Sequence, residues 1–390
     1  MNTNLDALII NSYAGSLVLG AQSTGLEIRG SYEDCGFGLP IQKLNFPKLK
    51  FVERTPWPKD NLSSTIVIAH PPCAAFSNQN NSVSRKGINT DAFKCHREVM
   101  DYSMSNRCAA LAIESVPGAL KAQAEYAKYA RKYNYTHYFI HLNSASFGVS
   151  QWRPRVWMIF LRDLPRLVVN PPWEWKTVGD ILQTPEEYEA AVGAGIEPNV
   201  MMKKLLDYFG KKFKTAEFNF EEFLKFENIG SFVPAVAEFL NIEKTREAVN
   251  KACGTSGLFG VRLPRKMDLR WFSPVILDDS FFFANGRPLT MIEYQRIMGF
   301  PDDFKWPENL KRKFTMYLSK GVAPPVAAWI AKTLVMNCEK TISLSPARTQ
   351  VGAPGEILDI RPNTDQAKEA VNRSRNKTLP FVGKFKRAAV

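Results

Sequence analysis

The sequence has few of the features that define secreted, membrane or zinc-stabilised proteins. Its six cysteines are scattered, with no Cys-x-x-Cys pair and no Cys/His cluster at metal-ligand spacing, so we expect free thiols and no metal. No apolar run approaches the ~20 residues that span a bilayer, and the chain opens without the basic start of a signal peptide. These absences predict a cytoplasmic protein with no membrane partner.

Negative charge is also scarce relative to positive charge. The 390 residues include 51 Lys and Arg against 38 Asp and Glu, a net charge of +13. An excess of this size suggests a polyanionic partner such as nucleic acid. The excess belongs to residues 1–165 (+6) and 286–390 (+9), whereas residues 166–285 carry −2. The two ends of the chain are therefore the expected source of the positive field.

The first 165 residues alternate between short apolar runs and helical spacing, a pattern typical of an α/β fold with a mostly parallel sheet. This alternation stops in residues 166–285, and a new ordered unit with two helices, 290–298 and 324–336, fills residues 286–338. Residues 339–390 show little periodicity, and we expect a basic, loosely ordered tail. The predicted strands are 6–11, 26–32, 65–70, 109–113, 136–142 and 155–161, and the main helices between them are 91–106 and 118–132.

A cysteine follows one of the predicted strands directly. The segment from His70 to Ser77 reads His-Pro-Pro-Cys-Ala-Ala-Phe-Ser, and it places Cys73 at the carboxyl end of strand 65–70, the edge where open sheets bind ligands. Two prolines fix the backbone before the thiol. The polar, basic residues 77–87 are typical of a mobile lid. A turn with an incidental cysteine explains the segment alone equally well.

Two further polar groups stand at strand ends. Glu114 follows the strand 109–113, where a partly buried carboxyl group is suited to donate a proton, although a helix-capping acid is the simpler interpretation in isolation. Gln151, Arg153 and Arg155 begin the strand 155–161. Arginines two apart point to the same face and can hold carbonyl or phosphate oxygens, and a surface ion-pair stripe is the simpler interpretation of this pair.

Taken in order, these segments resemble the motifs of the cytosine-5 DNA methyltransferase family of phage and bacterial type. The resemblance implies a Rossmann-like S-adenosylmethionine-dependent methyltransferase sheet with a smaller inserted target-recognition domain, here residues 166–285. The resemblance also implies that residues 1–165 form the catalytic domain and that the C-terminal motifs in residues 286–338 return to it. The matching residues are Tyr13-Ala14-Gly15 with Gly20, Glu33, Pro71-Pro72-Cys73 with Phe76-Ser77, Glu114-Ser115-Val116, Asn143–Gly148 with Gln151, Arg153 and Arg155, Arg287–Thr290 with Glu293 and Gly299–Phe304, and Gly321–Ala327.

The resemblance implies roles for specific residues and a partner, double-stranded DNA, in a bacterial cell or phage-infected host, with the protein acting as a monomer. S-adenosylmethionine is the expected cofactor. The implied catalytic residues are Cys73, Glu114, Gln151, Arg153 and Arg155. The implied cofactor-binding residues are Tyr13, Ala14, Gly15, Glu33, Pro71, Lys320, Gly321 and Val322. The expected DNA contacts are Ser77, Arg85, Lys86, Arg262, Arg265 and Lys266.

In the implied reaction, a cysteine thiolate adds to C6 of a cytosine that has been flipped out of the duplex, and C5 then takes the methyl group. We expect Cys73 to be this nucleophile, with a depressed pKa. Glu114 would protonate N3, Arg155 would hold O2, Arg153 would order the site, and Gln151 would brace the turn.

Several residues depart from the family pattern and bear on the identity of the donor. Ser16-Leu17-Val18 replaces a glycine-rich donor turn, Ala69-His70 replaces a glycine pair, and Lys320 stands where the last motif has Asn or Gly. A lysine there would suit a donor that carries a carboxylate, carboxy-S-adenosylmethionine, in place of plain methyl transfer, although a lysine that points to solvent or pairs with a DNA phosphate is the simpler interpretation. The sequence is also compatible with a non-catalytic DNA-binding relative and with an enzyme that acts on tRNA. Three further departures are Ala74, Ser115 and Ile292.

Overall fold

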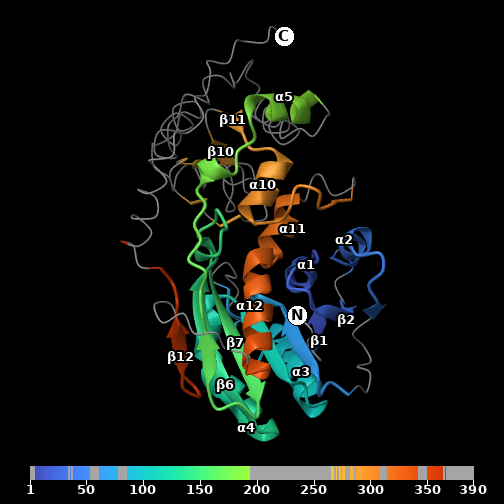
Figure 1. Ribbon diagram of the computed structural model, residues 1–390, viewed down its shortest axis with the longest axis vertical. Coiled ribbons are helices and arrows are strands. Elements are labelled where there is room, and N and C mark those ends of the chain that lie inside the picture. Colours follow the sequence, from blue (N-terminus) through green and yellow to red (C-terminus); the bar gives the residue numbers. More distant parts are fainter. Residues whose placement is uncertain are drawn as a thin grey trace.

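A computed structural model describes most of residues 5–193 and several later segments of the chain (Figure 1). Its centre is an eight-stranded sheet with the strand order β13-β6-β7-β5-β4-β1-β2-β3. The described residues are 5–33, 36, 38–52, 61–77, 86–193, 265–267, 269, 272–273, 275–276, 282–284, 287–307, 314–340, 349–362 and 365.

The sheet is mostly parallel, as the sequence predicts. Only β7 runs against its neighbours β5 and β6, and the other paired strands of this sheet are parallel. The α/β fold class is therefore confirmed, and the carboxyl ends of the parallel strands meet at one edge. The strands are β1 (Asp6–Ile10), β2 (Glu27–Tyr32), β3 (Phe51–Val52), β4 (Thr65–Ala69), β5 (Ala110–Ser115), β6 (Tyr135–Asn143), β7 (Pro154–Arg162) and β13 (Ile357–Asp359).

Helices cover both faces of the sheet, and alternate side chains of each apolar strand belong to the cores on the two faces. In β1, Ala7 and Ile9 belong to one buried core, whereas Leu8 and Ile10 belong to the other, because successive side chains of a strand point to opposite faces. The first core is shared with α1 (Ser16–Gln22) and α12 (Pro324–Cys338), and the second with α3 (Asp91–Ser105) and α4 (Gln123–Tyr133).

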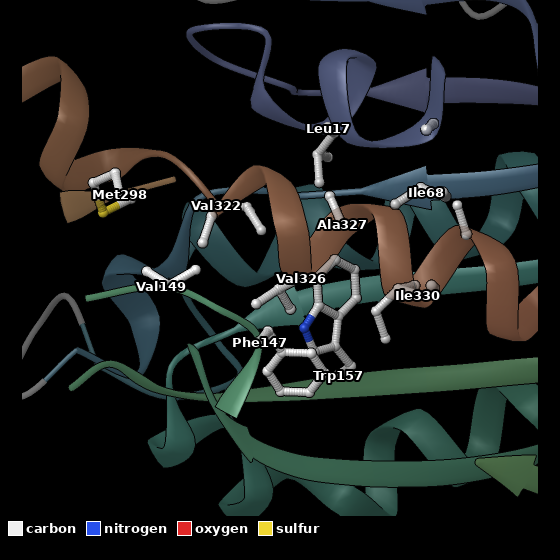
Figure 2. Close-up of a cluster of buried hydrophobic side chains, with 14 of the residues drawn as sticks. Leu17, Ile68, Phe147, Val149, Trp157, Met298, Val322, Val326, Ala327 and Ile330 are labelled. Carbon is white, nitrogen blue, oxygen red and sulfur yellow. The ribbon is translucent and has the colours of Figure 1, made fainter. Parts of the chain in front are cut away.

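Helix α12 lies beside α1 on the first face, and both helices pack against the sheet (Figure 2). Its residues Val326, Ala327 and Ile330 are buried and point towards Leu17 on one side and Trp157 on the other. A Cβ at Gly20 would lie 2.6 Å from the Cβ of Ala327, so only glycine allows α1 and α12 to pack this closely. The C-terminal motif is thus fastened beside the helix that follows β1.

Helix α5 (Pro185–Gly193), strands β10 (Phe282–Ala284) and β11 (Arg287–Pro288) and helix α10 (Met291–Ile297) extend from one end of this core (Figure 1). Residues 194–264, which make up most of the predicted target-recognition domain, lie outside the described residues, so that domain boundary stays a prediction. Helix α10 begins with a capping box in which Thr290 and Glu293 satisfy each other's backbone N–H groups. The other elements are α2 (Gly38–Asn45), β8 (Leu167–Val169), β9 (Arg265–Lys266), α11 (Phe314–Lys320) and β12 (Gln350–Gly352).

Within the predicted loosely ordered tail, residues 339–390, the segment 349–362 instead forms two strands, whereas residues 366–390 lie outside the described residues. Strand β13 pairs in parallel with β6 at the edge of the central sheet, and β12 pairs with β8. Leu358 and Ile360 are buried, and their burial in the core stabilises this segment. The segment is too short to show a periodic pattern in the sequence. In the part of the chain that is described, no helix is long and apolar enough to cross a membrane.

Candidate active site

Cys73 begins a single turn of 3₁₀ helix, η1 (Cys73–Ala75), directly beyond β4. The Cys73 carbonyl accepts a hydrogen bond from Phe76 N at 3.0 Å, which closes the turn. A Cβ at Gly118 would lie 2.4 Å from the Phe76 carbonyl oxygen, so the turn after β5 packs closely against this loop. The Cys73 side chain is half-buried, which leaves its sulfur within reach of a ligand at the sheet edge.

Glu114 lies beside this loop and is almost fully buried, at 1% exposure. Arg155 donates from Nε to Glu114 Oε1 at 2.9 Å, and His70 Nε2 lies 3.2 Å from Glu114 Oε2. Both carboxylate oxygens therefore face a nitrogen atom. The helix-capping interpretation of Glu114 is wrong, because the carboxylate is held within the sheet edge and not at a helix start.

Sequence reasoning did not find the contact between His70 and Glu114. Strands β4 and β5 pair in parallel with Ala69 opposite Ile113, so the residues that follow, His70 and Glu114, emerge side by side. The register of two strands is not readable from their sequences, which explains the omission. The position of His70 immediately before the two prolines was the only signal available.

The side chain of Arg153 reaches the C-terminal motif. Its guanidinium Nη2 donates to the carbonyl oxygens of Ser319 at 2.8 Å and Gly321 at 2.7 Å. The side chain is 2% exposed, and Gln151, also buried, accepts a longer contact of 3.5 Å from its Nη1. The surface ion-pair interpretation is therefore wrong. Arg153 joins the start of β7 to the loop after α11.

The electrostatic environment of Cys73 differs from the expected one. Burial raises the pKa of the Cys73 thiol, the carboxylate of Glu114 raises it further, and the cations Arg155 and Arg153 lower it. The prediction of a depressed pKa is thus wrong for the protein without substrate, because the depth of the sulfur is not visible in the sequence. Burial also lowers the pKa of His70, so a neutral imidazole faces Glu114 near pH 7.

The other half of the candidate site follows β1 and β2. Glu33, 3% exposed, ends β2, and its Oε2 accepts hydrogen bonds from Tyr13 N at 2.7 Å and Gln42 Nε2 at 2.9 Å. Gly15 has a φ of 91°, and a Cβ there would lie 2.7 Å from the Phe46 ring. The backbone turn from Tyr13 through Ala14 to Gly15 is therefore fixed next to the buried acid.

The C-terminal motif reaches this turn. Val322 N donates to Ser16 Oγ at 3.2 Å, so the first residue of α1 binds the returning loop. Lys320 is exposed at the end of α11, Gly321 follows it, and Pro71 is buried just beyond β4. Tyr13 stacks on Tyr317 of α11, with ring centroids 5.9 Å apart. The turn Tyr13–Gly15, Glu33 and the loop Lys320–Val322 thus lie on segments that contact one another.

The predicted DNA contacts are described only in part. Ser77 is half-buried and Lys86 is exposed, whereas Arg85 and Arg262 lie outside the described residues. Of Arg265 and Lys266 only the backbone is described, as strand β9 beside β10. Across the described ranges, no group of three or more His, Cys, Asp and Glu residues is arranged to hold a metal ion.

A cavity of about 540 Å³ lies apart from these groups, between α1, the segment 176–181 and the start of α12. Its lining includes Leu19, Asp180 and Pro325, and none of the predicted catalytic or cofactor-binding residues. The cavity therefore does not mark the candidate site.

Comparisons with solved structures show the same fold. A DNA modification methyltransferase encoded within an E. coli prophage is 16% identical, with a TM-score of 0.54 over 85% of this chain and 98% of that one. DNMT2 of Spodoptera frugiperda is 13% identical, with a TM-score of 0.54 over 85% and 99%. The methyltransferase EhMeth of Entamoeba histolytica is 12% identical, with a TM-score of 0.55 over 88% and 100%.

Sequence comparison gives the family. No curated protein matches the chain. The model of the C-5 cytosine-specific DNA methylases, however, matches residues 9–336. This range contains the cysteine loop, the Glu114–Arg155 pair and the returning C-terminal motif. The match covers well over half of the sequence, and the chain belongs to the C-5 cytosine-specific DNA methylase family.

Proposed function

We propose that this transferase moves a methyl group from S-adenosylmethionine to C5 of a flipped cytosine in double-stranded DNA, with Cys73 as the covalent nucleophile. One observation carries the proposal. Cys73, Glu114 and Arg155, from three separate segments, meet at the carboxyl edge of the sheet, with Arg155 Nε 2.9 Å from Glu114 Oε1. This set supplies a nucleophile, a proton carrier and a cation, which are the groups that cytosine activation requires.

The chemistry follows from the electron demand of the ring. Cys73 Sγ forms a bond to C6, and the electrons of the C5–C6 double bond make C5 nucleophilic. Glu114 donates a proton to N3 as negative charge develops there, and Arg155 donates a hydrogen bond to O2. After C5 has taken the methyl group, a water molecule accepts the C5 proton, the bond between Sγ and C6 breaks, and N3 returns its proton to Glu114. The ring regains its double bond and the thiolate is released.

The raised pKa of Cys73 favours the thiol before substrate binds. Thiolate formation therefore belongs to the bound state, in which the Glu114 carboxylate takes the thiol proton of Cys73 and passes it to N3 as Sγ bonds to C6. Neutralising that carboxylate removes one of the two causes that raise the pKa of Cys73. The cations Arg153 and Arg155 remain to stabilise the anion.

S-adenosylmethionine fits the residues on the other side of the edge. A buried carboxylate at the end of the second strand, Glu33, suits the two ribose hydroxyls, and the fixed turn Tyr13–Gly15 and the loop Lys320–Val322 enclose the same place. When bound, the cofactor supplies a methyl group on a positively charged sulfur. Because Lys320 is exposed at a helix end, transfer from carboxy-S-adenosylmethionine is the second donor to be tested.

Double-stranded DNA is the proposed substrate, bound by the chain as a monomer. A cytosine must leave the stack before C6 is accessible, and Ser77, Arg85 and Lys86 border the cysteine loop closely enough in sequence to contact the flipped nucleotide. Arg262, Arg265 and Lys266 are the proposed contacts from the recognition segment, as phosphate or guanine ligands.

Trapping tests this function. With a duplex carrying 5-fluorocytosine, fluorine at C5 cannot leave as a proton does, so the bond between Sγ and C6 persists after methyl transfer. We expect a denaturation-resistant complex with S-adenosylmethionine and wild-type protein. Cys73→Ala should give none, whereas Cys95→Ala, which changes a half-buried thiol on α3, should react normally. A complex formed by Cys73→Ala would overturn the mechanism.

The same assay distinguishes this function from its competitors. A complex formed on a fluorinated tRNA but not on DNA would assign the tRNA substrate instead. Binding of DNA without any complex, and without affinity for S-adenosylhomocysteine, would assign a non-catalytic relative. Supplying carboxy-S-adenosylmethionine in place of S-adenosylmethionine and weighing the product identifies the donor, with Lys320→Asn as the matched variant.

A further inference from the structure

A buried histidine outside the active-site edge contacts the backbone next to Cys73. His96, on helix α3, is 0% exposed. Its Nε2 lies 3.3 Å from the carbonyl oxygen of Pro72, and its Nδ1 lies 3.0 Å from the hydroxyl oxygen of Tyr126 on α4. One side chain therefore connects two helices to the residue that immediately precedes the nucleophile.

The two partners determine which ring nitrogen carries the hydrogen. A carbonyl oxygen only accepts, so His96 Nε2 must donate to Pro72, and Nδ1 must then accept from the Tyr126 hydroxyl. This arrangement requires a neutral ring. Burial lowers the pKa of His96 to about 3, so the ring remains neutral over the pH range in which a DNA-modifying enzyme works.

The orientation of the Pro72 carbonyl determines where the Cys73 side chain points, and the loop itself offers few hydrogen bonds to fix it. It belongs to the peptide that joins Pro72 to Cys73, and neither Pro71 nor Pro72 has a backbone N–H with which to fasten the loop. Rotation about the Pro72 ψ angle, 120° here, swings the Cys73 side chain. A hydrogen bond to that carbonyl therefore fixes the direction in which the sulfur leaves the backbone.

The imidazole itself is held firmly. Phe93 stacks on it with ring centroids 5.6 Å apart and an interplanar angle of 19°, and Phe76, from the cysteine loop, meets its edge at 5.9 Å. Tyr126 fixes the remaining direction through its hydroxyl. The ring cannot turn without disturbing both helices, so its donor stays aimed at the loop.

We propose that His96, oriented by Tyr126, is a positioning residue that aims Cys73 Sγ at C6 of the cytosine. This inference rests on the proposed nucleophilic role of Cys73 and extends it to two residues that do not touch the substrate. A neutral imidazole suits the task because it supplies one donor and one acceptor on opposite sides of a rigid ring. A misplacement of about 1 Å at a reacting atom costs on the order of a hundredfold in rate.

Substitutions at His96 test the proposal by the rate at which the 5-fluorocytosine duplex is trapped under single-turnover conditions. His96→Leu removes both hydrogen bonds and should slow trapping about 10- to 100-fold, with the Kd for the duplex changed less than about threefold. His96→Gln presents an amide donor and an amide acceptor and should restore the rate to within about fivefold of wild type. Rescue by Gln would not occur if the position required only bulk.

Comparing Tyr126→Phe with a matched control distinguishes a specific effect on Cys73 from a general loss of stability. Tyr126→Phe leaves His96 Nδ1 without its donor and should slow trapping several-fold. Tyr135→Phe removes a comparable buried hydroxyl, which donates to the Cys108 carbonyl at 2.6 Å, and should leave the trapping rate unchanged. If His96→Leu does not fold, the comparison of these two tyrosine variants decides the matter.

The outcomes are separable. No trapping by wild-type protein would reject the proposed function. Normal trapping by wild type with equal rates in His96→Leu, or equal slowing in Tyr126→Phe and Tyr135→Phe, would reject the positioning role alone. Slow trapping by Leu and Phe at these two positions, with rescue by Gln, supports it.

Discussion

Arg155 Nε lies 2.9 Å from Glu114 Oε1, across the antiparallel pairing of β7 with β5. The reversal of β7 is what brings a cation from the start of that strand to the carboxyl end of β5. The buried carboxylate is thereby held in place by a charged partner that is itself only partly exposed. The same two groups flank Cys73 and set opposing influences on its pKa.

Glu114→Gln should remove proton donation while preserving the size of the side chain. We expect the methylation rate to fall by about 10²- to 10⁴-fold, the usual contribution of a general acid, with DNA affinity nearly unchanged. The matched control is Glu27→Gln. Glu27 is exposed and begins β2, at the end of that strand away from the candidate site. Single-turnover methylation of a duplex measures the effect, and a decrease of less than about threefold would contradict the role of Glu114.

Arg153→Met should weaken donor binding and folding together. The variant leaves the Ser319 and Gly321 carbonyls without their charged donor, a loss of about 2–4 kcal/mol in the free energy of unfolding. The loop that reaches Ser16 loses its anchor, so calorimetry should show a Kd for S-adenosylhomocysteine at least about tenfold higher. Arg162→Met, which removes a partly exposed guanidinium at the far end of β7, should leave that Kd unchanged.

Acid should destabilise the protein through its buried histidines. In the unfolded chain His96 titrates near 6.5, whereas in the folded protein its pKa is about 3, so the unfolded state binds more protons between these values. The stability that neutral His96 contributes is fully present above pH 6.5 and is lost as the pH falls towards 3. Relative to His96→Gln, the free energy of unfolding should fall by about 1.4 kcal/mol per pH unit below about 6.5.

Urea unfolding of both proteins between about pH 7.5 and 5 measures this difference. His70 has a pKa lowered by burial as well and is present in both proteins, so its contribution cancels. A difference in stability that does not change with pH would show that His96 is not a neutral buried base.

Two truncations separate the structural and the electrostatic parts of the tail. Ending the chain after Lys340 removes β12 and β13, with the buried Leu358 and Ile360, and should lower the Tm by several degrees. Ending it after Asp365 keeps both strands but removes seven basic residues and one acidic residue. We expect an unchanged Tm and a slope of log K against log salt that is shallower by about 2 to 5. An unchanged slope would show that the tail does not contact DNA.

The strands of the catalytic part were predictable because each is a short apolar run whose alternate residues serve two cores. The short segments were not. Strand β3 has two residues and β13 has three, and α2 contains Pro40 in its first turn, so none of them shows a period. The two strands are placed by pairing with β2 and β6, and α2 by packing against the first core, and the local sequence does not encode these contacts.

The sequence predicted which residues gather at this edge of the sheet, but not the contacts that they make there. Cys73, Glu114 and Arg155 do meet at one edge, as their positions at strand ends indicate. The contacts of His70 with Glu114 and of His96 with Pro72 depend on strand register and on the packing of α3. The raised pKa of Cys73 depends on burial. These properties arise only when the elements are assembled.

The central claim is that Cys73 carries out covalent methyl transfer to cytosine, and one measurement addresses it most directly. Duplex DNA is incubated with S-adenosylmethionine and either wild-type protein or Cys73→Ala, digested to nucleosides and analysed by mass spectrometry. We predict 5-methylcytosine with the wild type and none with Cys73→Ala, while both proteins retain similar affinity for the duplex. Formation of 5-methylcytosine by Cys73→Ala, or its absence with a wild-type protein that binds both DNA and donor, would contradict the account.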